Sequence, residues 1–251
     1  IELMGKMSDI DNENYEAFKA DGLLEVLNME VSGGEVPFPV NLSKVTMYFS
    51  PRFVNLETFD ALIGTSDIHM NGRLENFIPY VFSDETIKGQ LELSSGLLDL
   101  NELMSGMEED TTTEEEEEFE LSVIEVPKNI FFVFNSQLDK VLYDKLDITN
   151  IEGKITAKDG MILMENLSMN LLNGSMIMSG EYNTADINNP LVDLKFNMNQ
   201  VDIPMAFDAF NTVQKLAPIA ENCLGSMSVN LNFTSFLDST MYPVLTSIVG
   251  K

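Results

Sequence analysis

The sequence predicts a mainly β fold: an extended, twisted or curled antiparallel sheet with one principal helix and a few short ones. Three observations lead to this prediction. Apolar and polar residues alternate over many short segments, as in Leu194–Asn199, and such alternation places the two kinds of side chain on opposite faces of a strand. Turn-forming dipeptides separate these segments. One stretch only has a sustained helical spacing of apolar residues.

The alternating segments give each expected strand one apolar and one polar face, which is typical of antiparallel sheets with one solvated side. The clearest are Leu27–Ser32, Leu167–Leu171, Leu194–Asn199 and Val229–Thr234. Turns are expected at Ser32-Gly33-Gly34, Lys158–Gly160, Asn173-Gly174 and Ser179-Gly180. Of these, Asn173-Gly174 has the composition of a two-residue type I′ hairpin turn.

The principal helix is expected near residues 205–220. Apolar residues there follow the i, i+3, i+4 spacing of a helical face, and Pro204 suits a first turn. This spacing predicts a helix of roughly 12–15 residues. Shorter helices are expected at Leu56–Ile63, Glu75–Phe82 and Leu100–Met104.

A strand followed by Asp or Asn recurs along the chain and suggests a repeated architecture. The polar residue in the four copies is Asn55, Asp99, Asp202 or Asp238. After each we expect a helix or loop, with this side chain near the N-cap, where its oxygen accepts hydrogen bonds from free backbone N–H groups.

A strongly acidic segment divides the chain. Nine of the thirteen residues from 108 to 120 are Asp or Glu, so we expect an exposed linker, with a cation-binding loop as the alternative. The segment separates a first β unit, residues 1–107, from a second, residues 121–251. The two units are either separate or joined in one continuous sheet.

Composition excludes several classes of protein. The chain has 41 acidic and 14 basic residues, a net charge of −27, which repels phosphate backbones and argues against nucleic acid as a partner. A single cysteine excludes an intramolecular disulfide framework and a cysteine-based zinc site. We expect no metal and no cofactor. No apolar run reaches the ~20 residues of a membrane helix, so any anchor is expected outside these residues.

Catalysis is not expected. His69 lies two residues after Asp67, but the chain has no G-x-S-x-G nucleophile motif, so we interpret His69 as a surface residue of a strand. Cys223 has no general base marked by spacing and is expected to be a buried structural thiol. Phosphate-binding and dinucleotide-binding glycine motifs are also missing from the sequence.

Several stretches together resemble the AsmA family of envelope proteins of Gram-negative bacteria. They are Phe49–Phe59 with Ile63–Ile68 and Gly72–Phe77, Ile87–Ser94 with Leu98–Asn101, Asp159–Leu167 with Gly174 and Ser179-Gly180, and Asn222–Ser228 with Leu237–Pro243 and Ile248–Gly250. The resemblance implies a periplasmic region behind an inner-membrane anchor, a strongly curved sheet with an apolar channel, and a role in outer-membrane assembly or phospholipid movement. The glutamate-rich run is not a feature of that family.

The apolar strand faces need a cover, and with so few helices the sheet must pack on another sheet or curl on itself. A curl that is incompletely filled would shelter phospholipid acyl chains, because each buried CH₂ contributes about 0.8 kcal/mol. The candidate lining residues are Leu91, Leu93, Leu167, Met169, Leu171, Leu194, Phe196, Met198, Val229, Leu231 and Phe233. The alternatives are a scaffold that binds outer-membrane assembly proteins without lipid, and a surface-exposed adhesive or carbohydrate-binding domain.

Overall fold

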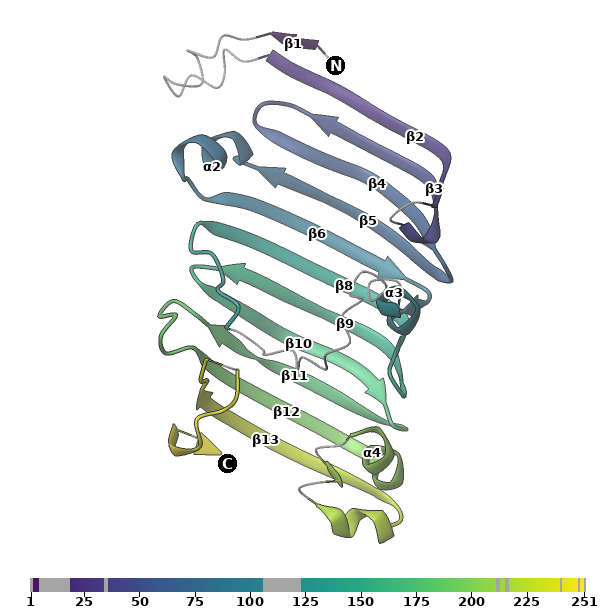
Figure 1. The fold of residues 1–251 in the computed structure, drawn as a ribbon, viewed down its shortest axis with the longest axis vertical. Coiled ribbons are helices and arrows are strands. Elements are labelled where there is room, and N and C mark those ends of the chain that lie inside the picture. Colours follow the sequence, from purple (N-terminus) through teal and green to yellow (C-terminus); the bar gives the residue numbers. More distant parts are fainter. Residues whose placement is uncertain are drawn as a thin grey trace, which may run out of the picture.

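The computed structural model of this chain describes residues 2–4, 19–33, 36–105, 123–210, 213–214, 217–239, 241–247 and 249–250. These residues form one open sheet of fourteen strands with a few short helices at its margins (Figure 1). The predicted mainly β fold class is therefore confirmed. Neighbouring strands in the sheet are mostly neighbours in the sequence, as expected for short connections.

Antiparallel pairing runs through the first six strands. They are β1 (Glu2–Met4), β2 (Lys19–Gly33), β3 (Val36–Phe49), β4 (Phe53–Ile63), β5 (Ser66–Glu75) and β6 (Ile87–Ser95). The strand β6 then pairs in parallel with β8 (Ile130–Tyr143), and the two-residue β7 (Leu98–Asp99) also pairs in parallel with β8. The halves on either side of the acidic segment thus belong to one sheet; residues 108–120 themselves lie outside the described residues.

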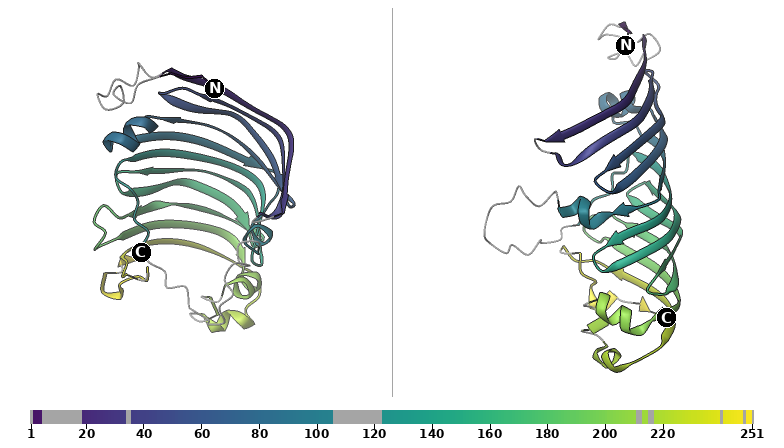
Figure 2. Two further views of the ribbon diagram at one scale, coloured as in Figure 1. Left: turned by 45° about the horizontal axis from the view of Figure 1, so that its top comes forward. Right: turned by 90° about the vertical axis from the view of Figure 1, so that its right-hand side faces the viewer.

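The second half continues the antiparallel order to the other edge of the sheet. Its remaining strands are β9 (Leu146–Lys158), β10 (Met161–Leu171), β11 (Gly174–Asn183), β12 (Leu191–Asp202), β13 (Ser226–Phe236) and β14 (Val249–Gly250). Figure 2 shows that the strands bend along their length, so that the sheet is an open trough. The helices α3 and α4 and the C-terminal segment lie on its concave side.

Two of the three predicted short helices are confirmed. They are α2 (Phe77–Ser83) and α3 (Leu100–Ser105). The helix predicted at Leu56–Ile63 is wrong, because these residues lie in β4. The register of β4 against β5 shifts between Leu56 and Phe59. The bulge adds one residue to β4, so these two apolar side chains lie on the same face of the sheet although they are three residues apart, the spacing expected of a helix.

The helix predicted near residues 205–220 is interrupted at Phe210. The helix α4 (Ile203–Ala209) ends after seven residues, because Phe210 adopts an extended conformation (φ −118°, ψ 109°). Val213 and Gln214 are helical again, while residues 211–212 and 215–216 of the predicted range lie outside the described residues. The 3₁₀ helix η3 (Pro218–Asn222) follows later, and another 3₁₀ turn, η4 (Leu245–Ser247), lies near the C-terminus. Phe210 packs with Ala206 and Ala209 against the sheet, so tertiary packing overrides the helical spacing of the sequence.

Three of the four predicted Asp or Asn positions begin a helix or turn. The N–H of Glu102 donates to Asp99 Oδ1 (3.0 Å), and the N–H of Met205 donates to Asp202 Oδ1 (2.9 Å). Asp238 Oδ1 accepts a hydrogen bond from the N–H of Tyr242 (3.0 Å). The prediction for Asn55 is wrong, because this residue lies inside β4.

Of the four predicted turns one is confirmed, two are misplaced and one falls partly outside the described residues. Asp159 and Gly160 have φ values of 52° and 79° and connect β9 to β10 as predicted. Gly33, with φ 85°, ends β2 and pairs with Val36, and Gly34 of the predicted turn lies outside the described residues. In the β10–β11 hairpin Leu171 pairs with Gly174, so the turn residues are Leu172 and Asn173, one position earlier than predicted. Gly180 lies within β11, where a Cβ atom would collide with the backbone of Asp193 on β12.

Candidate functional site

An apolar row crosses the sheet at right angles to its strands. Residues paired directly across adjacent strands have side chains on the same face. One such row from β2 to β13 contains nine apolar residues and two glycines: Leu24, Met47, Leu56, Gly72, Leu91, Phe134, Ile155, Met164, Gly180, Leu194 and Phe233. Ten strand spacings of roughly 4.8 Å give this row a length of about 48 Å. We call the side of the sheet that carries it the apolar face.

A second row lies beside the first on the same face. It contains Val26, Val45, Phe59, Met70, Leu93, Ser136 and Gly153, and continues through Leu167, Met178, Phe196 and Leu231. Gly153 joins its two parts, because a Cβ atom there would collide with the side chain of Leu167. The apolar face is therefore a band at least two residues wide over eleven strands.

All of the lining residues predicted from the sequence lie on the apolar face, although they come from four strands. Leu171 is buried (8% exposed), whereas Val229 and Leu231 are 36% and 43% exposed. The others are half-buried: Leu91, Leu93, Leu167, Met169, Leu194, Phe196, Met198 and Phe233. All described strands belong to one sheet, so within the described part of the chain no second sheet covers this face.

Both ends of the strands are covered, and this cover explains why Leu171 is buried. On one side Ala206 of α4 packs against Leu171, Leu172 and Val201, with Met169, Met176 and Met198 around them. At the other end of β11 the hydroxyl of Tyr182 donates to the carbonyl of Ile124 (2.9 Å). Burial raises the pKa of Tyr182. The uncovered apolar face lies between these two ends.

A hollow of about 400 Å³ opens on the apolar face where two glycines lie on adjacent strands. A Cβ atom on Gly72 would lie 2.5 Å from the carbonyl oxygen of Gln90, and one on Gly89 would collide with the ring of Phe132. The missing side chains lower the floor of the hollow. Its apolar walls are Val54, Leu56, Leu74, Leu91, Phe132 and Phe134.

Sequence reasoning named only Leu91 of these wall residues. The alternation in β8 is hidden because Ile130–Phe134 is a continuous apolar run. In β4 the bulge after Leu56 interrupts the two-residue period. A usable signal was the pair Gly72 and Gly89, since a glycine inside a strand often marks a close backbone approach.

The opposite face of the sheet is polar. A row on this side contains Asn71, Glu92, Asn135, Lys154 and Glu165. Lys154 Nζ lies 2.7 Å from Glu165 Oε2. The sheet is thus two-sided as the alternation predicted, and we call this side the polar face.

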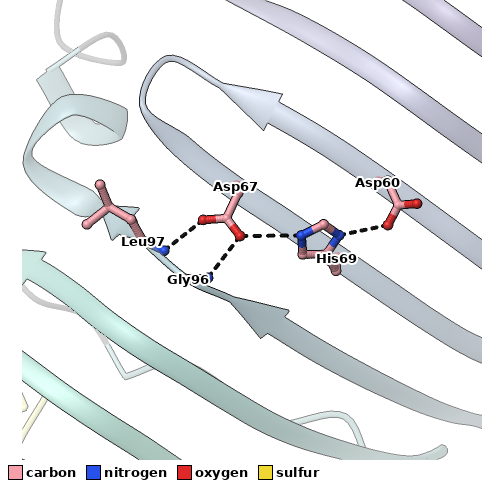
Figure 3. A network of polar contacts seen from close by, with 5 residues as sticks. All are labelled: Asp60, Asp67, His69, Gly96 and Leu97. Carbon is pink, nitrogen blue, oxygen red and sulfur yellow. Dashed lines mark hydrogen bonds and ion pairs between the residues drawn. The ribbon is translucent and has the colours of Figure 1, made fainter.

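A chain of polar contacts on the polar face joins β4, β5 and the segment after β6 (Figure 3). His69 Nδ1 lies 2.7 Å from Asp60 Oδ1, and His69 Nε2 lies 3.3 Å from Asp67 Oδ2. Asp67 also accepts hydrogen bonds from the N–H groups of Gly96 (2.8 Å) and Leu97 (2.7 Å). Because carboxylates occupy both ring nitrogens, His69 is not placed to take a proton from a serine hydroxyl.

These contacts shift two pKa values. The hydrogen bond with Asp60 is the main cause of a raised pKa at His69, and the charge of Asp67 adds to it. Burial raises the pKa of Asp67, but the hydrogen bonds from Gly96 and Leu97 outweigh that effect, and the net pKa is lowered. The predicted surface position of His69 is confirmed, since its side chain is 51% exposed.

Three other sequence predictions concern metal ligands, a membrane helix and the cysteine. Among them no group of three or more His, Cys, Asp or Glu side chains could hold a metal ion. No helix in the described ranges is long and apolar enough to cross a bilayer. Cys223, predicted to be buried, is only half-buried, because it follows η3 at the margin of the sheet; its Sγ lies 3.4 Å from the carbonyl oxygen of Ile219.

Comparison with known proteins gives no relative. No family model, no curated protein and no solved structure matches this chain.

Proposed function

We propose that this protein is the periplasmic part of an AsmA-like envelope protein, and that it shelters phospholipid acyl chains on the apolar face of its sheet. One observation supports the proposal above all. The apolar row runs without a polar interruption from β2 to β13 and has only half-buried or exposed side chains at its centre. Soluble proteins rarely leave so large an apolar area without a partner.

The energetics suit an apolar ligand bound without polar contacts. At about 0.8 kcal/mol for each buried CH₂, a dozen methylene groups would contribute on the order of 10 kcal/mol before the cost of ordering the chain. The head group would stay in water, since neither of the two described rows on the apolar face contains a charged side chain that could bind it. Inner-membrane attachment and periplasmic location rest on the family resemblance alone.

The hollow at Gly72 and Gly89 is the point on the row that suits an acyl chain best. Its walls are aliphatic and aromatic, and its volume of about 400 Å³ lies within the roughly 300–1,000 Å³ of small-molecule sites. Phe132 and Phe134 stand on one side of it and Leu56 on the other. A chain that lay along the row would cross this hollow midway between the edges of the sheet.

Native mass spectrometry of protein purified from cells without detergent tests the proposal. Co-purified phospholipid that is released by organic extraction would support it. Protein that carries no lipid, and that binds none when mixed with phospholipid vesicles, would contradict it.

One observation favours a scaffold as the second candidate. The strand β14 pairs with only Phe233 and Thr234 of β13, so within the described residues Ser226–Asn232 has an open edge. An open edge can accept a strand from another protein. Capture of outer-membrane assembly proteins by lipid-free protein, and loss of that capture when proline replaces Asn230, would favour this role.

A further inference from the structure

A second hollow, of about 690 Å³, lies where β9, β10, β11 and β12 reach the β10–β11 turn. It is distinct from the apolar hollow, since the two share no lining residue. Six of its twelve lining residues carry amide or hydroxyl side chains, and the charged residues Lys145 and Asp147 line it too. Leu171, Leu172 and Met205 form its apolar part. The volume is within the roughly 300–1,000 Å³ of small-molecule sites.

A ladder of uncharged side chains forms one wall of this hollow. Thr149 pairs with Asn170, Asn170 with Ser175, and Ser175 with Asn199. These four residues, which we call the amide–hydroxyl ladder, lie on four consecutive strands about 4.8 Å apart. Among the described residues, the side chains of Thr149, Asn170 and Ser175 form no hydrogen bond with the protein, so their donors and acceptors face the hollow or solvent.

The neighbouring structure holds the ladder in place. Asn199 Oδ1 accepts a hydrogen bond from Ser228 Oγ (3.1 Å), and Ser228 Oγ accepts one from the N–H of Gln200 (3.0 Å). With its oxygen engaged, Asn199 keeps its Nδ2 hydrogens for a ligand. A bulge between Met198 and Val201, with Gln200 at φ 53°, adds Gln200 to the same wall.

Both charged side chains at this hollow already have a partner in the protein. Asp147 Oδ2 lies 2.9 Å from Lys140 Nζ, and Lys145 Nζ lies 3.4 Å from the carbonyl oxygen of Asp208. A phosphate or carboxylate ligand would meet one lysine in a chain of net charge −27, and arginine, the usual bidentate partner of such anions, is not among the lining residues. A hard cation needs several carboxylate oxygens, and this wall offers only that of Asp147.

Neutral sugar hydroxyls match this wall chemically. Each hydroxyl both donates and accepts, and the amide and hydroxyl side chains of the ladder do the same. We propose that the hollow binds a neutral polyhydroxylated ligand, namely a hexose unit of a free oligosaccharide or of a glycan. This inference goes beyond acyl-chain shelter and does not depend on it, because the ladder lies on the other face of the sheet.

The test follows the side-chain amide signals of the full chain by NMR during titration with tetrasaccharides of glucose, mannose, galactose and N-acetylglucosamine. Saturable shifts at Asn170 and Asn199 with at least one of these sugars are expected. The double variant Asn170→Ala/Asn199→Ala should weaken that binding at least tenfold. The matched control Asn230→Ala/Asn232→Ala, on the polar face of β13 outside the hollow, should change it less than twofold.

Three results would overturn the inference. They are no shift with any of the four sugars, equal weakening in the ladder and control variants, and tighter binding of inorganic phosphate than of every sugar. Unfolding midpoints of both variants control for folding, and the single variant Ser175→Ala replaces the double variant if that one is unstable. Acyl-chain binding should persist in the ladder variant, so failure here is separable from failure of the proposed function.

Discussion

A single acidic substitution in the apolar row should weaken acyl-chain binding strongly. Leu91 stands at the crossing of the row with the hollow at Gly72, directly opposite Phe134 on β8. In Leu91→Asp, an acyl chain that lies on the row would cover a carboxylate, and burying an unpaired charge costs several kcal/mol. About 1.4 kcal/mol of this cost already corresponds to a tenfold loss of affinity. We therefore predict that the dissociation constant for a fluorescent fatty acid becomes at least tenfold larger.

The adjacent residue on β6 provides a matched control. Gln90 is exposed on the polar face, so Gln90→Asp adds the same charge to the same strand on the other side of the sheet. Its dissociation constant should stay within twofold of that of the wild type. Equal weakening by both substitutions would show that net charge rather than the apolar face governs binding, and would refute this reasoning.

Leu91→Asp should also be the less stable of the two variants, and this must be measured. The leucine is half-buried, so about half of the roughly 1.5–3 kcal/mol of a fully buried leucine is at risk. Urea unfolding should therefore show a loss of about 1 kcal/mol, well short of unfolding the protein. Binding measured well below the unfolding midpoint then reports on the face itself.

Three further predictions concern stability and can be checked by urea unfolding. Asp202→Ala removes the side-chain cap of α4 and should cost about 1 kcal/mol, whereas unchanged stability would contradict the capping role. Leu171→Ala, at a site 8% exposed, should cost about 2–5 kcal/mol, and Leu231→Ala, at a site 43% exposed, clearly less; equal losses would contradict the placement of α4 over only one end of the face. The raised pKa of His69, due mainly to Asp60, means that protonation favours the folded state. The advantage of the wild type over His69→Gln should be complete below pH 6.5 and shrink as the pH rises through the raised folded-state pKa; an advantage that grows with pH would contradict this.

The sequence predicted the two-sided strands well, because the two-residue period follows from strand geometry alone. It failed where bulges change that period. The apolar spacing lengthens from two to three residues between Met164 and Leu167 and between Met198 and Val201, where the register shifts. Asn166 and Gln200, at φ 50° and 53°, occupy these points, and their left-handed backbone is the kind of local feature that a period count does not detect.

Two parts of the candidate sites depend on contacts between residues far apart in the sequence. The pairing of β6 with β8 brings Phe134 beside Leu91 across the acidic segment, and no local pattern specifies a parallel pair over such a distance. The amide–hydroxyl ladder needs the registers of β9, β10, β11 and β12 to coincide. The hairpin turns fix such registers, and one of these turns lies a residue away from the predicted position.

Photo-crosslinking inside cells tests the central claim most directly. A benzophenone amino acid would replace Phe134 on the apolar face or, in a matched variant, Asn135 on the polar face of the same strand, and lipid adducts would be identified by mass spectrometry. We predict a phospholipid adduct with the variant at Phe134 and at most a trace at Asn135. Equal adducts at both positions, or none at Phe134 while purified protein remains folded, would contradict acyl-chain shelter on this face.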